Sequence, residues 1–269
     1  MTDRVAAAHP PVAWRRIVEA APPLDLPIAV GGGLDPVSLL AAYRHGAFPF
    51  PNDEASAAAV NCVLYEADVA RGDIACLSDR APLGPFSLTW WHPPRRPVIH
   101  RGTVHLSRRL KQELRNRHAW TTRCDTAYER ALTECRARRR QRWMTDELCR
   151  ALLDLHRDGW AHSIEIWDGT ELVGGLIGVA VGTVFSMDSA FSRRPNAAKV
   201  AVADLDRRLG GTPARLLDVQ IPSAYTTALG GVTMSRAEYL AEVLVSHQRL
   251  VPRHGELDVR SLAARAERA

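Results

Sequence analysis

The sequence predicts an α+β protein in which helices pack against a largely antiparallel sheet. Helix-start signals recur, with Thr145 before two acidic residues and a capping box at Ser235–Glu238. Two strand-like segments, 163–167 and the run from Glu171, flank a glycine turn. A chain of 269 residues, 46% of them hydrophobic, can form one large domain or two small ones.

The N-terminal third contains one clear helix and one unusual segment. Residues 1–24 are rich in Ala and Pro and predict little regular structure. A helix should begin after Asp35, its N-cap, with Pro36 in the first helical position, and end at Gly46. Residues 52–87 are polar and alanine-rich, with strand-like pieces around 63–65 and 74–77.

The middle of the chain predicts three helices with basic segments among them. Ser107 can cap a basic helix that begins at Arg108, and a second helix should cover about 126–138. That helix runs into a cluster of arginines over 136–142. The third helix starts after Thr145 and stops at Gly159.

The C-terminal part continues the alternation of strands and helices. Beyond the glycine-turn hairpin, strand is predicted over 179–187 and 214–221. Helices are predicted over 196–209 and after Ser235, and a frayed helical tail is predicted over 255–269.

The composition favours an anionic partner and gives no sign of a metal or a membrane segment. The net charge is +5, and Lys111 and Lys199 are the only lysines, so arginine supplies nearly all the positive charge. Arginine suits phosphate binding, although genomic G+C bias produces the same skew. The five cysteines form no CxxC pair and the histidines lack metal-ligand spacing, so we expect neither disulfides nor a metal site. No long apolar run is present, which favours a cytoplasmic protein that spans no membrane.

Three acidic or amide side chains lie in apolar surroundings. Asp218 and Gln220 are two residues apart on a predicted strand and should share one face. Burial would raise the pKa of such an acid, which suits acid–base chemistry, but a structural hydrogen bond would look the same. Asp188 could likewise serve a site or form an ion pair with Arg193 at a strand end.

Trp143 lies between the arginine cluster and the helix that starts after Thr145. An aromatic ring beside a basic patch can stack on an unpaired base, although a tryptophan packed at a helix start is an equal alternative. The basic segments are either solvated faces or a surface for an RNA backbone. The candidate backbone-binding residues are Arg108, Arg109, Lys111, Arg136, Arg138, Arg139, Arg140 and Arg142.

Ordered stretches of the chain resemble the leucyl/phenylalanyl-tRNA–protein transferases over about 25–51 and 89–245. They include Val30–Pro36, Leu39–Pro49, Trp90–Pro93, Trp143–Thr145, Ala161–Trp167, Asn196–Lys199 and Asp218–Gln220. The resemblance implies a small N-terminal α/β domain (1–88) and an acetyltransferase-like (GNAT-like) catalytic domain (89–269). It also implies charged tRNA of the leucyl type as co-substrate, with no cofactor and no metal.

The resemblance further assigns site residues. The family's catalytic pair falls on Asp218 and Gln220, and its adenine-stacking aromatics fall on Phe50 and Trp143. Its aminoacyl pocket falls on Leu176, Phe185, Met187, Asp188, Ala190, Val202 and Leu217. We expect a mechanism in which Asp218 polarises Gln220, whose carbonyl oxygen holds the attacking amine, and in which Asp218 or the leaving ribose oxygen finally takes the proton. Asp188 would contact the α-ammonium of the aminoacyl group.

The departures from the family lie on the acceptor side of this scheme. Asp188 replaces a glutamate, Ser223 replaces an asparagine near the expected acceptor, and 52–87 is an insertion. They favour a small amine metabolite, such as an antibiotic, as acceptor. The alternatives are protein N-termini with basic residues, as in N-degron tagging, an acyl-CoA N-acyltransferase, and a non-catalytic RNA-binding module. An acyl-CoA N-acyltransferase requires a phosphate-binding turn at the start of a helix, whereas Arg207–Gly211 lies at the end of a predicted helix.

Overall fold

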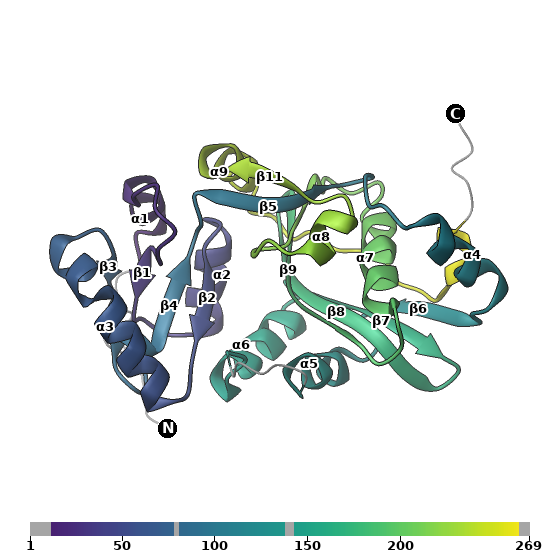
Figure 1. Cartoon of the computed structure of the whole chain (residues 1–269), viewed down its shortest axis with the longest axis horizontal. Coiled ribbons are helices and arrows are strands. Elements are labelled where there is room, and N and C mark those ends of the chain that lie inside the picture. The colour runs from purple at the N-terminus through teal and green to yellow at the C-terminus, as the bar shows by residue number, and fades with distance from the viewer. Residues whose placement is uncertain (1–11, 78–80, 138–142, 264–269) are drawn as a thin grey trace, which may run out of the picture.

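The computed structural model describes residues 12–77, 81–137 and 143–263, and it contains two β-sheets flanked by helices (Figure 1). This mixed arrangement confirms the predicted α+β class. One sheet has the strand order β2-β4-β1-β3 and the other β11-β5-β10-β9-β8-β7-β6-β12. The chain passes from the smaller sheet to the larger one between β4 and β5, at Trp91 and Arg95.

The smaller sheet is built around two short central strands. Its strands are β1 (Ala29–Val30), β2 (Phe48–Pro51), β3 (Ala75–Cys76) and β4 (Leu88–Trp91). The helices of this part are α1 (Trp14–Ala20), α2 (Pro36–Tyr43) and α3 (Ala55–Arg71), with a 3-10 turn at Pro85–Ser87. The predicted start of α2 is confirmed, because the Asp35 carboxylate accepts a hydrogen bond from the Ser38 N–H at 3.0 Å.

Residues 63–65, predicted as strand, lie instead within α3, so that prediction was wrong. The helix begins in the alanine-rich run 55–59, and alanine has the highest helix propensity. It ends at Gly72, whose φ of 83° is left-handed and whose N–H caps the last turn. The second strand-like piece of the segment is confirmed as β3, which pairs in parallel with β1.

The larger sheet is antiparallel except where β9 and β10 run in parallel. Its longest strands are joined by glycine turns at Gly169 and Gly182, each with a left-handed φ. Its strands are β5 (Arg95–His100), β6 (Trp120–Cys124), β7 (Ala161–Asp168), β8 (Glu171–Val181), β9 (Val184–Ser192), β10 (Leu216–Asp218), β11 (Val232–Ser235) and β12 (Leu257–Asp258).

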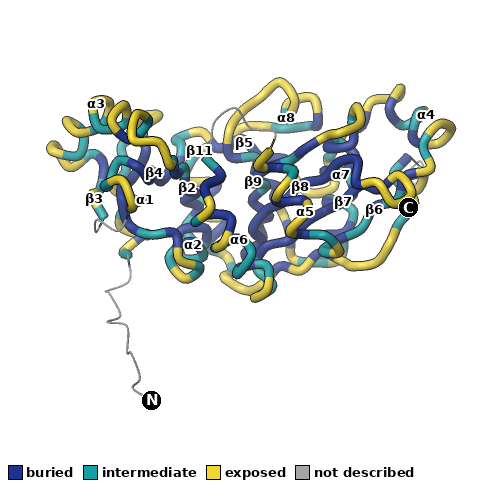
Figure 2. The backbone as a smooth tube through the Cα atoms, turned by 90° about the horizontal axis from the view of Figure 1, so that it is seen from below, coloured by how far each residue is buried: buried dark blue, intermediate teal, exposed yellow. Residues whose placement is uncertain are grey.

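Helices cover both faces of the larger sheet, and the buried residues form separate apolar clusters on the two sides (Figure 2). On one side α5 (Tyr128–Ala137) and α6 (Asp146–Arg157) pack against β7 and β8. On the other side lie α7 (Ala197–Arg208), against β7–β9, and α4 (Arg108–Asn116). The short α8 (Ala224–Ala228) and α9 (Arg236–Val243) flank β11 in the chain. The predicted caps at Ser107, Thr145 and Ser235 are confirmed.

Two C-terminal predictions were wrong in extent. The predicted strand 214–221 is reduced to β10, because Gln220 has a left-handed φ of 59° that cannot continue a ladder. The tail is not helical over 257–262, where it forms β12 and a 3-10 turn at Val259–Leu262. Residues 264–269 lie outside the described residues. None of the helices in the described ranges has the length and hydropathy of a membrane-spanning segment.

Candidate functional site

A β-bulge places Asp188 at the centre of the candidate site. Along the β8–β9 pair, Ile177 faces Ser189 and Gly178 faces Met187, so Asp188 is an extra residue without a partner. Such a bulge redirects side chains and shifts the alternation of faces. Met187 and Ala190, three residues apart, therefore pack against the same apolar cluster.

The Asp188 carboxylate is buried and only half satisfied. Its Oδ1 accepts hydrogen bonds from the Tyr43 hydroxyl and from Gln220 Nε2, both at 2.7 Å. Its Oδ2 is buried and receives no hydrogen bond from any described residue. Burial raises the pKa of Asp188 to about 7, against the opposing effect of these two hydrogen bonds. The predicted alternative, an ion pair with Arg193, was wrong, because Arg193 pairs with Glu134.

The Asp218 carboxylate is fully engaged with donors. It forms a two-pronged ion pair with Arg96 at 2.8 and 2.6 Å, and both side chains are at most 1% exposed. It also accepts hydrogen bonds from the Ser186 hydroxyl (2.7 Å), the Tyr239 hydroxyl (2.8 Å) and the Gln220 N–H (2.9 Å). Burial alone would raise the pKa of Asp218, but the charge of Arg96 and these donors hold it below its usual value.

Gln220 connects the two carboxylates. Its backbone N–H donates to Asp218, while its side-chain Nε2 donates to Asp188 and, at 3.3 Å, to the Ser186 hydroxyl. No described residue donates to its Oε1. The left-handed φ of Gln220 turns the chain at the end of β10, so a local turn, not a shared strand face, brings these groups together.

Two cavities meet at Gln220. The first, of about 750 Å³, lies between the smaller sheet, α3 and the segment after β10. The second, of about 720 Å³, lies between β9, α7 and α8. Both are lined by Phe50, Trp143, Gln220, Ile221 and Pro222. Asp218 lies behind this shared wall and lines neither cavity, whereas Asp188 lines the second one.

Phe50 and Trp143 are brought together as predicted, but as a stacked pair. Their ring centroids are 5.4 Å apart and their planes are inclined by 24°. This is the spacing of two rings in direct contact. A base can lie between them only after the rings separate.

The predicted pocket residues fall into two groups. Met187, Asp188, Ala190 and Val202 line the second cavity. Leu176, Phe185 and Leu217 do not line it, because all three are fully buried in the sheet beneath the cavity. Ser223 also lines the second cavity, where its hydroxyl caps α8 by accepting a hydrogen bond from the Thr226 N–H at 3.1 Å.

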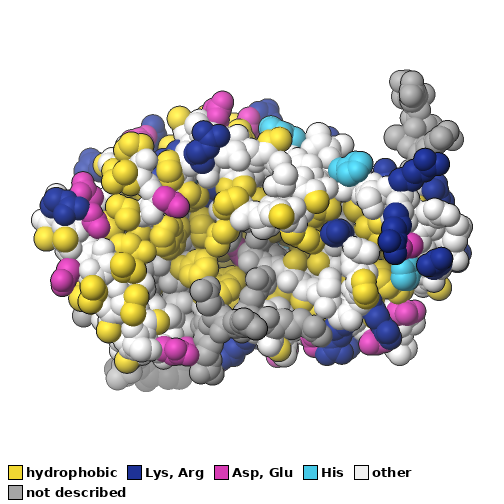
Figure 3. Space-filling model, in the orientation of Figure 1, with side chains coloured by type: hydrophobic (Ala, Val, Ile, Leu, Met, Phe, Trp, Pro, Cys, Tyr) yellow, Lys and Arg dark blue, Asp and Glu magenta, His cyan; other side chains and the backbone are white. Residues whose placement is uncertain are grey.

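The predicted RNA-binding residues are only partly described. Arg108, Arg109 and Lys111 lie on α4, and Arg109 pairs with Glu113 in the same helix. Figure 3 shows Lys and Arg side chains at the α4 end of the molecule and hydrophobic side chains around the central hollow. Arg136 pairs with Asp146. The other four lie outside the described residues: Arg138, Arg139, Arg140 and Arg142.

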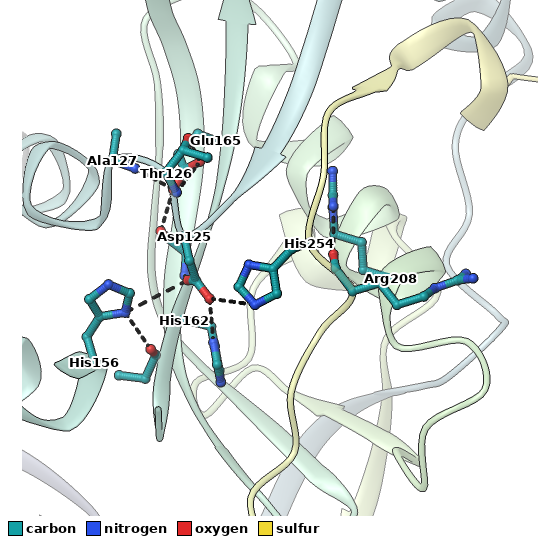
Figure 4. A network of polar contacts seen from close by, with 11 residues as sticks. Asp125, Thr126, Ala127, His156, His162, Glu165, Arg208 and His254 are labelled. Carbon is teal, nitrogen blue, oxygen red and sulfur yellow. Dashed lines mark hydrogen bonds and ion pairs between the residues drawn. The ribbon is translucent and has the colours of Figure 1, made fainter. Parts of the chain in front are cut away.

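Away from the cavities, three histidines surround Asp125 (Figure 4). His162 Nδ1 lies 2.7 Å from the carboxylate, and His156 and His254 lie within 3.9 and 3.8 Å. Cys124, Asp125 and His254 could offer ligand atoms within 4.8 Å of one another. Burial raises the pKa of the Cys124 thiol, however, and a metal ligand must be a thiolate. We therefore regard the network as a structural tie between β7, α6 and the C-terminal segment.

Sequence reasoning missed four residues that shape the site. Tyr43 was predicted only to lie in the helix that begins after Asp35, and Arg96, Ser186 and Tyr239 were not singled out. Arg96 did carry a signal, because it directly precedes the apolar run 97–99 and a charge beside a buried strand needs a partner. The other three make contacts that depend on tertiary packing and have no sequence signal that we can identify.

Comparisons with known proteins match most of this chain to one family. The family model described as "Leucyl/phenylalanyl-tRNA protein transferase" matches residues 98–244. Proteins named leucyl/phenylalanyl-tRNA–protein transferase are similar over 220 residues, 80% of this chain. One from Xanthomonas campestris pv. campestris is 36% identical over 76% of its length, and one from Xanthomonas oryzae pv. oryzae is 38% identical over 75%. A third, from Xylella fastidiosa, is 34% identical over 77% of its length.

Proposed function

The chain belongs to the leucyl/phenylalanyl-tRNA–protein transferase family and is a tRNA-dependent aminoacyltransferase that forms amide bonds, and we propose that its acceptor is a protein N-terminus with a basic residue. The names of its relatives specify a protein acceptor, so they favour this alternative over the small amine metabolite expected from the sequence. The observation that carries the proposal is the meeting of two cavities at Gln220.

The second cavity is the proposed site of the aminoacyl end of charged tRNA. Its walls include Met187, Ala190 and Val202, which suit an aliphatic side chain such as leucine. Pocket contacts separate similar aliphatic side chains by only ~1–3 kcal/mol, so preference for leucine over methionine would be modest. Phe50 and Trp143 stand at its mouth, where they would separate to stack on the terminal adenine.

The larger sheet is the proposed GNAT-like domain, preceded by a small N-terminal domain. The parallel pair β9–β10 supports this assignment, because its pairing ends at Ser186 and Asp218 and the second cavity opens just beyond. We propose that the boundary between the two domains falls between β4, which ends at Trp91, and β5, slightly after residue 88.

In the proposed mechanism Gln220 holds the attacking amine. Its Oε1 is free of donors from described residues and can accept a hydrogen bond from the incoming amine. The amine nitrogen attacks the ester carbonyl carbon, and the bond to the ribose oxygen then breaks. No ATP or metal is required, because the aminoacyl ester is already activated.

Asp188, rather than Asp218, is the better proton acceptor in this scheme. Asp218 accepts five hydrogen bonds and has a lowered pKa, so it is a positioning residue that holds Ser186 and Gln220. Asp188 has a pKa of about 7 and an unpaired Oδ2. A group with these properties can accept a proton from the amine and return it to the leaving ribose oxygen.

The tRNA backbone is proposed to cross the α4 end of the molecule, where Arg108, Arg109 and Lys111 are gathered. If about five basic residues contact phosphate, log affinity should fall with log salt at a slope of about −4. A flat response would exclude the basic segments as the tRNA surface.

The test offers the protein labelled leucyl-tRNA together with separate acceptors. Peptides with an N-terminal Arg or Lys should be labelled by the wild type, while small amines should not. The Asp154→Asn variant changes an exposed carboxylate on α6 and serves as a control that should retain transfer. Labelling of small amines but not of peptides would overturn the proposed acceptor.

A further inference from the structure

The first cavity has the charge and the walls of a separate binding site. From its charge and its lining residues we infer that this cavity is a subsite for a positively charged acceptor side chain, and that α3 supplies one of its walls. The inference rests on the proposed function, which it extends to the inserted segment 52–87. Glu54, Ala57 and Asn61, from the start of this segment and its helix, line the cavity.

Negative charge predominates at the rim of this cavity. Asp25, Asp53 and Glu54 line it and are exposed, and Arg95 is the one basic residue among the described lining residues. None of the three carboxylates lies within ion-pair distance of a basic group among the described residues; Arg136 interacts with Asp53 only at longer range and pairs with Asp146. Three carboxylates against one guanidinium attract a cation and repel the phosphates of a tRNA. This charge therefore suits the acceptor and not the donor.

Two of the residues that line the cavity carry unpaired polar oxygens. Asn52 Oδ1 is buried and receives no hydrogen bond from any described residue. Gln220 is 7% exposed, and its Oε1 also lacks a donor from the described part of the chain. Both oxygens are acceptors, and a guanidinium, an ammonium or an α-amine offers only donors.

Aromatic side chains also line the cavity. Phe48, Trp91 and Trp143 line the cavity and can pack against the methylene stem of a long basic side chain. Their ring faces also favour a nearby cation. An acceptor whose side chain lies in this cavity would bring its α-amine to Gln220, at the junction with the second cavity.

Contacts hold α3 in position against the smaller sheet. Asn61 Nδ2 donates to the Phe86 carbonyl at 2.9 Å, and the Tyr65 and Trp91 rings meet edge to face at 6.5 Å. The inserted segment is thus part of the cavity wall, because Trp91 and Asn61 themselves line the cavity. Its charge can change acceptor choice without altering the donor cavity.

The test neutralises the rim and compares two acceptors that differ only in charge. The variant is Asp25→Asn/Asp53→Asn/Glu54→Gln, and the control is Glu66→Gln, an exposed carboxylate on α3 that does not line the cavity. The acceptors are peptides with N-terminal arginine or with citrulline, its neutral isostere. If each of the three lost carboxylates contributes about twofold, as exposed ion pairs do, the arginine-to-citrulline ratio of kcat/KM should fall about tenfold in the triple variant. It should stay at the wild-type value in Glu66→Gln.

Added salt gives an independent check, because it should lower the wild-type ratio toward that of the triple variant. Binding of arginine amide and citrulline amide, followed by NMR shifts of the tryptophan ring N–H groups, reports on the subsite without catalysis. Arginine amide should bind more tightly to the wild type, and the triple variant should lose this preference.

The subsite and the proposed function can fail separately. If the wild type transfers to peptides but the triple variant keeps the arginine preference, the subsite is overturned and the proposed function stands. If the triple variant loses transfer to both peptides equally, the rim is structural and the subsite is again overturned. If the wild type transfers to neither peptide, the proposed function fails. Arginine amide binding that is lost in the triple variant would then still support the subsite.

Discussion

The Asp188→Asn variant tests whether the pKa of Asp188 is raised, as the proposed proton transfer requires. Asparagine keeps the shape of the side chain and an oxygen that can accept from Tyr43 and Gln220, but it cannot ionise. In the wild type, burial raises the pKa of Asp188 from 3.8 to about 7. Between these values the folded protein binds more protons than the unfolded chain, so ionisation of Asp188 lowers stability as pH rises.

The magnitude follows from the two pKa values. With an unfolded pKa of 3.8 and a folded pKa of about 7, linkage gives a loss of ~2–3 kcal/mol between pH 5 and pH 8. The Asp188→Asn variant should escape this loss and so gain on the wild type over the same interval. Urea denaturation at the two pH values measures the difference directly.

Asp218→Asn is the matched control, because the wild-type Asp218 carboxylate has a lowered pKa and forms an ion pair with Arg96. The Asp218→Asn variant should be less stable than the wild type at both pH values, since the substitution leaves the buried Arg96 guanidinium without a counter-charge. If the stability of Asp188→Asn fell with pH as steeply as that of the wild type, Asp188 would not have a raised pKa. Its assignment as the proton acceptor would then be withdrawn.

Three further outcomes are expected. Gln220→Ala should slow transfer by roughly 10²–10³-fold, the usual cost of a lost positioning group in a closed site, with donor binding nearly unchanged in a filter assay. Arg96→Met should cost ~3–5 kcal/mol in urea denaturation, because Asp218 loses its ion pair, and adding Asp218→Leu should recover part of that loss. No recovery in the double variant would show that Arg96 acts through packing instead. Trp143→Ala should weaken binding of an aminoacyl-adenosine mimic by ~1–3 kcal/mol in calorimetry, whereas unchanged affinity would exclude base stacking there.

The parts of the fold that could be predicted from the sequence are those with local causes. The Thr145 hydroxyl caps its own helix three residues on, and Gly169 makes the turn within its own hairpin. These interactions depend on neighbouring residues, so the sequence contains the whole signal. The helix over Ala55–Arg71 was misjudged because Val60 and Val63 favour strands, while the alanines around them favour a helix.

The parts of the site that could not be predicted depend on distant segments. Arg96 is 122 positions from Asp218, and Tyr43 is 145 positions from Asp188. Nothing in either neighbourhood indicates the partner, so the different surroundings of the two carboxylates became visible only in the structure. The resemblance placed both acids near the site, but it did not show which one already had its full set of donors.

The bulge at Asp188 makes the site sensitive to the length of a strand as well as to its composition. Removing this one residue would let β8 and β9 pair without interruption, which should leave the sheet intact or even better ordered. The residues on both sides of it would keep their partners on β8 and their faces, and the cavity would lose its carboxylate. A well-folded but inactive protein could therefore arise from a single-codon deletion, and an ordinary screen for misfolded variants would overlook it.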